Sequence, residues 1–519
     1  MSKDRSDHLY TLIKSMKKSE KRYFKVRNNS GSKEDSKYLM LFDALSEQEA
    51  FNEELIIENN SWINPQQFSN LKAHLYKKIL HSLKEYTSSS NEDILIREQI
   101  DYIQILFDRS LYQQSMQLLQ KVKKAIKKSD NLELQLEVLK WEKNLIPHTL
   151  GRNNIQRVNQ IVEEANTINE RLSRVNILTN LAVELNAIYL KTGYIRGKED
   201  KDRIQRIFDE QLPEWDVNDF SFREKLLWYE IQLSYYSFIQ EFTEVYNYAK
   251  NWVDLFDQTP NSSFYFEMYI KGLNQLLNAQ SRLMKFEEFF ETHKVLRDLA
   301  KHRLIGINEN IQIRLFKYSY AHQFNGYFML GEFSKGVNML QRIETRLESY
   351  IGMIDKHSEL VLFYKIACLY FGNGNYRKSI KWLNRIINSE DQDIREDVHS
   401  FARIINLITH YELGNRDVID YYIRSTYRFL LKKDDLHAFQ QYILEFLKNL
   451  SREITPKQLI DRFKELRDQL IVLSQSKYDK RAFVYFDIIS WLESKIEGRS
   501  VEDIIKSKIQ TRHSQLLAN

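Results

Sequence analysis

The chain has 519 residues, and its 76 Lys and Arg against 71 Asp and Glu leave a formal charge of only +5. This balance excludes a uniformly basic coat for nucleic acid, so any electrostatic function has to be local. Fourteen glycines and five prolines are few breakers for this length, which favours long helices. Alternating β-branched runs bounded by turn residues are not evident, and we predict an all-α fold.

The single cysteine and the amino terminus indicate the compartment. Cys368 lies in the apolar stretch 366–371, where we expect a buried small side chain, and one cysteine forms no disulfide within a chain. Residues 1–7 are polar and lack the apolar core of a signal peptide. Apolar runs elsewhere are far shorter than the roughly 20 residues that span a bilayer. We therefore expect a cytoplasmic protein without a membrane partner.

The first 87 residues are predicted to form a helical unit. Leu9, Leu12, Ile13 and Met16 lie on one face of a first helix, and Ser19 is a candidate cap for a second. A third helix is expected over 38–48 and a fourth from Pro65, with a loop over 28–33 between the second and third. The small polar residues 87–91 then mark a boundary, because they compete with helical hydrogen bonding.

A turn residue followed by a bulky anchor and an amphipathic stretch recurs eight times between residues 92 and 435, at intervals near 43. The clearest copies contain Gly331 before Phe333 and Gly374 before Tyr376. Such a period indicates stacked helical hairpins. The anchors of the eight copies are Tyr112, Ile155, Tyr194, Phe242, Phe286, Phe333, Tyr376 and Arg416.

The residues around the anchors resemble the tetratricopeptide repeat. The copy at Tyr376 has Phe363, Ile366, Ala367 and Tyr370 before the turn, then Ser379, Leu383 and Ile386 after it. The resemblance covers about residues 94–430, but the usual interval is about 34 residues and Arg416 replaces the turn aromatic. It implies a right-handed superhelical α-solenoid that binds peptides or proteins, and it carries no catalytic residue. The layout also resembles bacterial regulators that join a small helical domain to such repeats and sense a peptide.

The last segment, 436–519, is predicted to supply capping helices for the solenoid, since terminal units of such arrays need polar outer faces. Pro456 after Thr455 suits a helix start, and another helix is expected over 483–496. Ser500 with Asp503 is similar to a capping box before a third helix.

The sequence contains no phosphate-binding Gly-rich loop, metalloprotease motif, paired-Cys zinc spacing or nucleophile elbow. His293 and His302 are nine residues apart on one expected helix and do not share adjacent turns. We therefore expect a non-enzymatic protein with neither metal nor cofactor. The aromatic clusters at 235–236, 264–266 and 421–422 offer base stacking in principle, but inter-helix packing is favoured.

A basic patch near the amino end is the sharpest local charge signal. Its members are Lys14, Lys18, Lys21, Arg22 and Lys25. Four of these, all but Arg22, would share one face if the first two helices were continuous. The patch suits nucleic acid or an acidic protein, while a solvated, solubilising face is the plainer interpretation.

A polar strip is expected on the concave side of the solenoid. Tetratricopeptide geometry places there Ser234, Ser237, Asn274, Asn278, Ser281, Arg282 and Asn325. Asn both donates and accepts, so it suits the backbone of an extended peptide, and Arg binds a carboxylate in two parallel bonds. The alternative is that these side chains are simply hydrated. We predict a protein- or peptide-binding scaffold or regulator, with nucleic-acid binding by the basic patch as the alternative.

Overall fold

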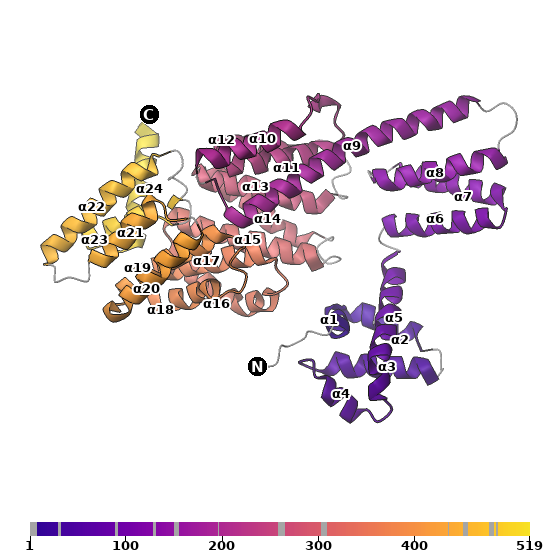
Figure 1. The fold of residues 1–519 in the computed structure, drawn as a ribbon, viewed down its shortest axis with the longest axis horizontal. Helices are drawn as coiled ribbons and strands as arrows, with labels where there is room; N and C mark the ends of the chain where they lie inside the picture. Colours follow the sequence, from indigo (N-terminus) through magenta and orange to yellow (C-terminus); the bar gives the residue numbers. More distant parts are fainter. Residues whose placement is uncertain are drawn as a thin grey trace. The chain divides into compact units, whose positions relative to one another are not determined.

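A computed structural model of the chain describes residues 8–29, 33–88, 92–127, 131–149, 155–195, 197–257, 265–302, 309–433, 435–449, 455–476, 482–483 and 486–518. These residues form 24 α-helices, α1 to α24, joined by turns and short 3₁₀ segments, without a strand among them (Figure 1). The all-α prediction is confirmed. Over the same ranges, none of the helices combines the length and the apolar character that crossing a membrane requires.

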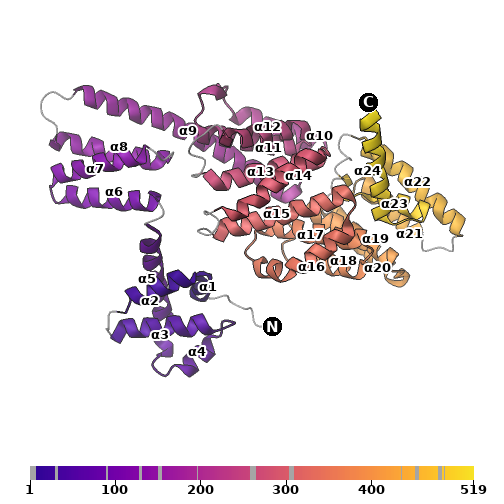
Figure 2. The same ribbon diagram turned by 180° about the vertical axis from the view of Figure 1, so that it is seen from behind.

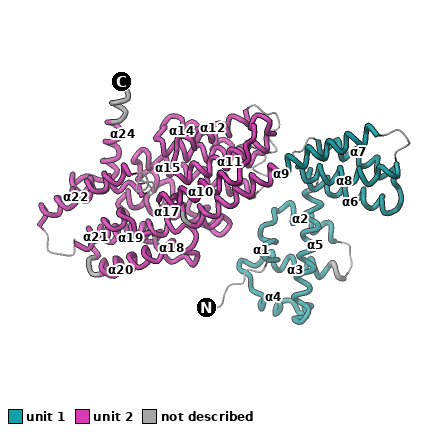
Figure 3. The backbone as a smooth tube through the Cα atoms, turned by 45° about the horizontal axis from the view of Figure 1, so that its top comes forward, with its two compact units in different colours: residues 1–173 teal, residues 174–519 magenta. Residues whose placement is uncertain are grey.

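The backbone divides into two compact units, residues 1–173 and 174–519 (Figure 3). The division falls inside one long helix, α9 (Ile155–Thr192). The domain boundaries that we expect near residues 87 and 435 are a different kind of division, and they stay predictions.

Unit 1 begins with five helices around a core of their own. Its buried side chains include Ile13, Phe24, Phe42 and Leu75, and together they bury the apolar faces expected from the sequence. A second core in this unit joins the next three helices through Ile103, Leu119 and others. The helices are α1 (His8–Ser15), α2 (Lys18–Arg27), α3 (Lys33–Glu47), α4 (Glu53–Asn59), α5 (Phe68–Ser88), α6 (Glu92–Asp108), α7 (Tyr112–Ile126) and α8 (Leu132–Thr149).

Three local details differ from the sequence expectations for this unit. Helix α2 starts at Lys18, and the Glu20 carboxylate accepts from the backbone N–H of Lys17 at 2.7 Å, so Ser19 is not its cap. The short helix α4 was not anticipated; the Asn52 side chain caps it by accepting from the Leu55 N–H at 3.0 Å. The expected boundary at 87–91 is helical to Ser88, and residues 89–91 lie outside the described ranges, as do residues 30–32 of the expected loop.

Unit 2 consists of the second part of α9 and fifteen further helices that pack mostly against their neighbours in the chain. They are α10 (Lys198–Gln211), α11 (Phe222–Phe238), α12 (Phe242–Asp257), α13 (Phe266–Arg282), α14 (Phe286–Asp298), α15 (Glu309–Leu330), α16 (Phe333–Tyr350), α17 (Lys356–Gly372), α18 (Tyr376–Ile387), α19 (Glu396–Glu412), α20 (Arg416–Lys432), α21 (Ala438–Asn449), α22 (Pro456–Ser474), α23 (Ile488–Glu497) and α24 (Val501–Ala518). Sequential packing of helix pairs defines a helical-repeat protein.

The same turn recurs six times, two residues before an expected anchor. A left-handed residue stands there in each copy, and the next residue donates its backbone N–H to the carbonyl five positions earlier, at 2.8 to 3.1 Å. This pattern satisfies the carbonyls at the end of the first helix. The second helix then begins at the anchor itself in every copy. The left-handed residues are Ser110, Gln240, Met284, Gly331, Gly374 and Gly414, and the anchors are Tyr112, Phe242, Phe286, Phe333, Tyr376 and Arg416.

Two anchors were wrong. Ile155 begins α9 but is 77% exposed, and Tyr194 lies between α9 and α10 instead of starting a helix. The hairpin expected between them is a single 38-residue helix. Residues 155–192 contain neither Gly nor Pro, the residues that most strongly interrupt a helix, and the helix continues through them.

A buried hydroxyl repeats three positions after the anchor in one hairpin of each unit. Ser115 donates to the Ile103 carbonyl and Ser379 to the Ala367 carbonyl, each at 2.9 Å and each across to the first helix of its own hairpin. A small side chain at this position therefore lets the two helices approach closely and also ties them together.

The C-terminal helices of unit 2 return along the turns of earlier hairpins. Trp491 and Lys495 on α23 donate to the two oxygens of the Glu412 carboxylate at 2.6 and 2.5 Å, at the end of α19. Glu502 on α24 accepts from the Ser334 hydroxyl at 3.0 Å, at the start of α16, and Figure 2 shows α24 in yellow near the carboxyl end. These helices thus brace several hairpins at once.

Candidate partner-binding surfaces

Four polar side chains form a hydrogen-bonded relay across the first helices of three successive hairpins. The Lys365 ammonium on α17 donates to Asn325 Oδ1 on α15, and Asn325 Nδ2 lies 3.3 Å from His322 Nδ1. His322 Nε2 in turn lies 2.9 Å from Asn274 Oδ1 on α13. We call these four residues the inner strip.

The hydrogen bonds and the burial of the inner strip determine the tautomer and the protonation state of His322. A neutral imidazole has one donor and one acceptor nitrogen, so His322 donates through Nε2 to Asn274 and accepts through Nδ1 from Asn325. Burial lowers the pKa of His322 well below its ordinary value, and the Lys365 charge lowers it further. The histidine is therefore neutral at physiological pH, and the strip carries a single titrating charge, on Lys365.

The Lys365 ammonium lies among other cations. Burial lowers the pKa of Lys365 to about 7, with further lowering by the charges of Arg282 and Arg395. Both arginines also act on the pKa of Tyr189 on α9, which burial raises. Both arginines therefore lie close enough to Lys365 and to Tyr189 to act on the two side chains.

The structure brings together some of the residues expected on the concave face. Asn274 and Asn325 meet through His322, whereas Asn278 and Arg282 lie further along α13 and are exposed. The Ser281 hydroxyl donates to the Asn278 carbonyl at 3.0 Å, and the Ser234 hydroxyl to the Glu230 carbonyl at 2.8 Å, both within their own helices. Ser237 is half-buried.

Sequence reasoning missed His322 and Lys365, which complete the strip. A signal for Lys365 exists: it interrupts the almost entirely apolar run 360–372 of a first helix. A lone charge in such a run is costly to bury without partners, so it points to a polar feature on that side.

The expected basic patch is divided between two environments. Lys14 and Lys21 both reach Ser46 at the end of α3, donating to its carbonyl at 2.8 Å and its hydroxyl at 2.9 Å. Lys25 forms an ion pair with Asp43 at 2.5 Å. The carboxyl end of a helix carries partial negative charge, which explains why these lysines gather there.

The remaining two members, Lys18 and Arg22, are exposed on α2, and no described acid lies within ion-pair distance of either. Helices α1 and α2 are not continuous, because the chain is extended at Lys17 between them, so the condition for one shared helical face is not met. Burial lowers the pKa of Lys21, and the charges of Lys14 and Lys25 add to this, so these three lysines do lie close together.

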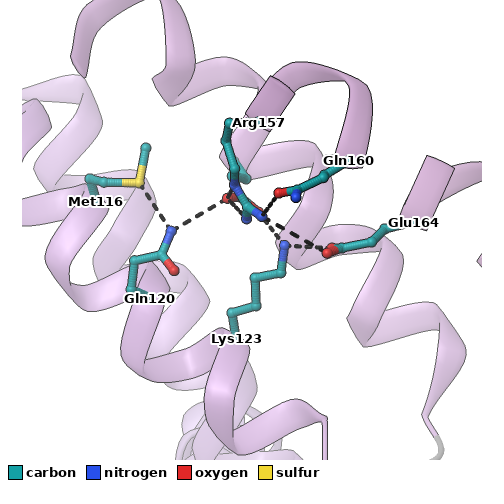
Figure 4. Close-up of polar contacts among 7 residues, drawn as sticks. Met116, Gln120, Lys123, Arg157, Gln160 and Glu164 are labelled. Atoms are coloured by element: carbon teal, nitrogen blue, oxygen red, sulfur yellow. Dashed lines mark hydrogen bonds and ion pairs between the residues drawn. The ribbon is translucent and has the colours of Figure 1, made fainter. Parts of the chain in front are cut away.

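Unit 1 contains a buried cluster of charged side chains among α7, α8 and α9 (Figure 4). Glu142, 1% exposed, accepts from Lys123 at 2.6 Å and from Arg157 Nε at 3.1 Å. Lys123 also donates to Glu164 at 2.6 Å. Burial alone would raise the pKa of Glu142, but the bonds from Lys123 and Arg157 lower it. Two acids balance two bases, so the cluster is suited to holding helices together.

Histidines, acids and Cys368 offer no cluster of three that could hold a metal ion within the described ranges. His293 is buried and bonds the Ser319 carbonyl at 3.0 Å, while His302 stacks on Phe266. Cys368 is buried as expected, and burial raises its pKa to about 12. Such a thiol is protonated and unreactive at neutral pH.

Most of the aromatic clusters pack between helices, as predicted. Tyr235 and Tyr236 contact Phe208 and Tyr248, and Tyr265 contacts Phe222. Phe264 lies outside the described residues. Tyr421 is the exception, because it is 62% exposed on α20. It points outward because α20 buries the opposite face, including Ile419 and Ile423.

No protein-family model matches the chain, and a search of curated proteins finds no match. The class, an all-α helical-repeat protein, rests on the six recurring turns and the sequential packing of its helices.

Proposed function

We propose that this protein is a non-enzymatic scaffold or regulator that binds a protein or peptide along the inner face of a tetratricopeptide-like, right-handed solenoid. In this proposal residues 1–87 are a separate helical unit, residues 436–519 cap the array, and the protein works in the cytoplasm without a cofactor. Arrays of stacked hairpins commonly use such faces to bind partners, which is an argument from the class of fold.

The observation that carries the proposal is the inner strip together with the exposed Asn278 and Arg282 next to it. Asn274 and Asn325 are neutral amides, and each engages the same imidazole. An extended peptide backbone offers N–H and C=O groups that could replace those bonds one for one. Arg282 supplies a cation for an acidic side chain or a terminal carboxylate.

The test is affinity purification from native cytoplasm at low and high salt, with and without nuclease. The bait is the full chain, compared with the Asn278→Ala, Arg282→Ala double variant. We expect a protein partner that survives nuclease and salt and is lost with the double variant. A partner retained equally by both baits would remove the inner face from the proposal.

A specific observation favours one alternative, nucleic-acid binding by unit 1. Lys18 and Arg22 are exposed without an acidic neighbour in the described structure, whereas Lys14, Lys21 and Lys25 are held by α3. Phosphate contacts of this kind are sequence-independent and weaken steeply with salt.

A charge-reversal variant tests nucleic-acid binding by unit 1. Lys18→Glu with Arg22→Glu reverses the exposed charges and leaves the three lysines on α3 untouched. Nucleic acid recovered with the parent protein, lost at high salt and absent with the double variant would favour the alternative. Unchanged recovery would exclude this surface.

A further inference from the structure

The end of α9 and the turn that follows it, residues 189–195, cross to helices that come much later in the chain. The backbone N–H of Arg395, the residue before α19, donates to the Leu190 carbonyl at 2.7 Å. On the other side, the Ile195 N–H donates to the Phe238 carbonyl at 3.3 Å, at the end of α11. One short segment therefore joins the first hairpin of unit 2 to the fifth.

The side chain of Arg395 also contacts this segment. Its guanidinium binds the Asp397 carboxylate through two bonds of 2.8 and 2.7 Å, and both residues are buried. The same guanidinium lies 5.0 Å from the Tyr189 ring centroid and 3.3 Å from His357 Nδ1 on α17. Planar, two-bond geometry of this kind is specific as well as strong.

At two positions of this arrangement the backbone adopts a left-handed conformation that residues with a side chain rarely adopt. Arg395 has φ 56° and ψ 57°, a left-handed conformation that costs free energy for a residue with a side chain. Gly193 has φ +73°, and a Cβ there would lie 2.2 Å from Asp397 Oδ2. Only glycine fits against the buried carboxylate at that point.

We propose that residues 189–195 are a clasp that closes the inner face of unit 2 beside the inner strip, and that a partner reaches the strip only when the clasp opens. The regulatory part rests on the proposed function, because it concerns access to the same site. His357 on α17 lies against the clasp, because its ring centroid is 5.7 Å from that of Tyr189 and its Nδ1 is 3.3 Å from the Arg395 guanidinium. The same helix carries Lys365 of the strip. A segment that restricts access to a site lowers the apparent affinity of a ligand, because only the open fraction of the protein binds it.

The clasp is tested on the purified full chain without any partner. Gly193→Ala places a methyl group against Asp397 in a strained backbone, while Gly197→Ala is the matched control, since nothing lies within 4 Å of its Cβ position. Arg395→Gly is a second variant, which removes the guanidinium but tolerates the left-handed backbone. Hydrogen exchange followed by mass spectrometry reports on amides 188–195 and on α21 and α22 as a reference.

Access to the strip is read from the Lys365 amine, by acetylation with sulfo-N-hydroxysuccinimide acetate and peptide mass spectrometry. We expect exchange of 188–195 and acetylation of Lys365 to rise about tenfold with Gly193→Ala and Arg395→Gly, with exchange of α21 and α22 unchanged. Gly197→Ala should behave as the parent protein.

Two results would overturn the clasp. One is parent-like exchange and acetylation in both clasp variants. The other is an equal rise throughout unit 2, which would mean general destabilisation instead of local opening. Neither result depends on a partner, so failure of the clasp is separate from failure of the proposed function, which the Asn278→Ala, Arg282→Ala purification decides.

Discussion

The charged cluster of unit 1 and the inner strip of unit 2 solve the same problem in different ways. Both link helices of successive hairpins through polar side chains around a buried one, which is Glu142 in the cluster and His322 in the strip. The cluster uses two acids and two bases around Glu142, whereas the strip uses two amides, a neutral imidazole and one ammonium. A buried ion pair cannot lose one partner without leaving an isolated charge, but a neutral amide can exchange one hydrogen bond for another. The cluster is therefore suited to permanence and the strip to exchange with a ligand.

Removal of the central acid of the cluster, Glu142, should have the largest effect on stability. We expect Glu142→Ala to lower the free energy of unfolding of unit 1 by about 3 to 5 kcal/mol, because Lys123 and Arg157 lose their shared partner. Chemical denaturation followed by circular dichroism measures the loss, and hydrogen exchange assigns it to unit 1. Glu163→Ala, at an exposed position of α9, is the control. A loss below about 1 kcal/mol would show that the cluster is not a unit.

Within unit 2, the packing of an anchor should outweigh any polar contact of the strip. Tyr376 packs against the core and on Phe371 with ring centroids 5.4 Å apart, and burial and the Glu412 carboxylate raise its pKa. We expect Tyr376→Ala to cost about 3 to 5 kcal/mol in equilibrium denaturation, since a large side chain is deleted.

Two further substitutions separate packing from polarity at this anchor. Tyr376→Phe should cost only about 1 kcal/mol, the value of one hydrogen bond. Tyr421→Ala, at the exposed tyrosine of α20, should change stability by less than about 0.5 kcal/mol. A Tyr376→Ala loss below about 1 kcal/mol would contradict the register of the repeats.

Neutral buried histidines should make unit 2 sensitive to mild acid. Burial and the Arg403 charge lower the pKa of His399 to about 4, while in the unfolded chain this histidine has its ordinary pKa of 6.5. The unfolded state thus binds more protons below pH 6.5, and stability falls as pH drops from 6.5 towards 4, by about 3 kcal/mol for this residue.

Denaturation curves at pH 7, 5.5 and 4 measure this effect, with His399→Gln as the matched variant. The variant should have a flatter pH dependence over that window. Parallel curves for the two proteins would exclude His399 as a source. Protonation of Glu142 also lowers stability as pH falls, but over a more acidic range. Because its pKa is lowered in the folded protein, this loss begins only as pH falls below 4.5.

The smallest effect is expected where the strip itself is cut. Asn325→Ala removes the bonds to Lys365 and His322, and we expect a loss of about 1 to 2 kcal/mol, well below that of Glu142→Ala. Thermal or chemical denaturation of the two variants side by side makes the comparison. Equal losses would mean that the strip is as obligatory as the charged cluster, which would contradict its proposed exchange of bonds with a ligand.

Local signals in the chain were enough to predict much of the fold. Six anchors begin helices where expected, since each follows a turn whose hydrogen bonds involve only residues five positions apart. Pro456 and Thr455 start α22 for the same reason, and Cys368 is buried because its neighbours are apolar. Tyr194 is not an anchor, because residues 155–192, which contain neither Gly nor Pro, form one continuous helix instead of a hairpin.

The candidate site was predictable only in part. The period placed Asn274 and Asn325 on first helices, but their meeting through His322 depends on how far each hairpin rotates relative to the next. That rotation results from the packing of whole helix faces, which no local pattern encodes. The capture of Lys14 and Lys21 by Ser46 is similar, since the end of α3 is distant in sequence.

By itself, the sequence determined the helices, their turns and the repeat, because hydrogen bonds and apolar periodicity act over a few residues. Only the tertiary structure decided which polar groups share a buried environment: Glu142 with Lys123 and Arg157, Asn325 with Lys365, and the clasp with Arg395. The reason is that burial makes each polar group require a partner, and the partner is whichever group the packed helices bring within hydrogen-bond distance.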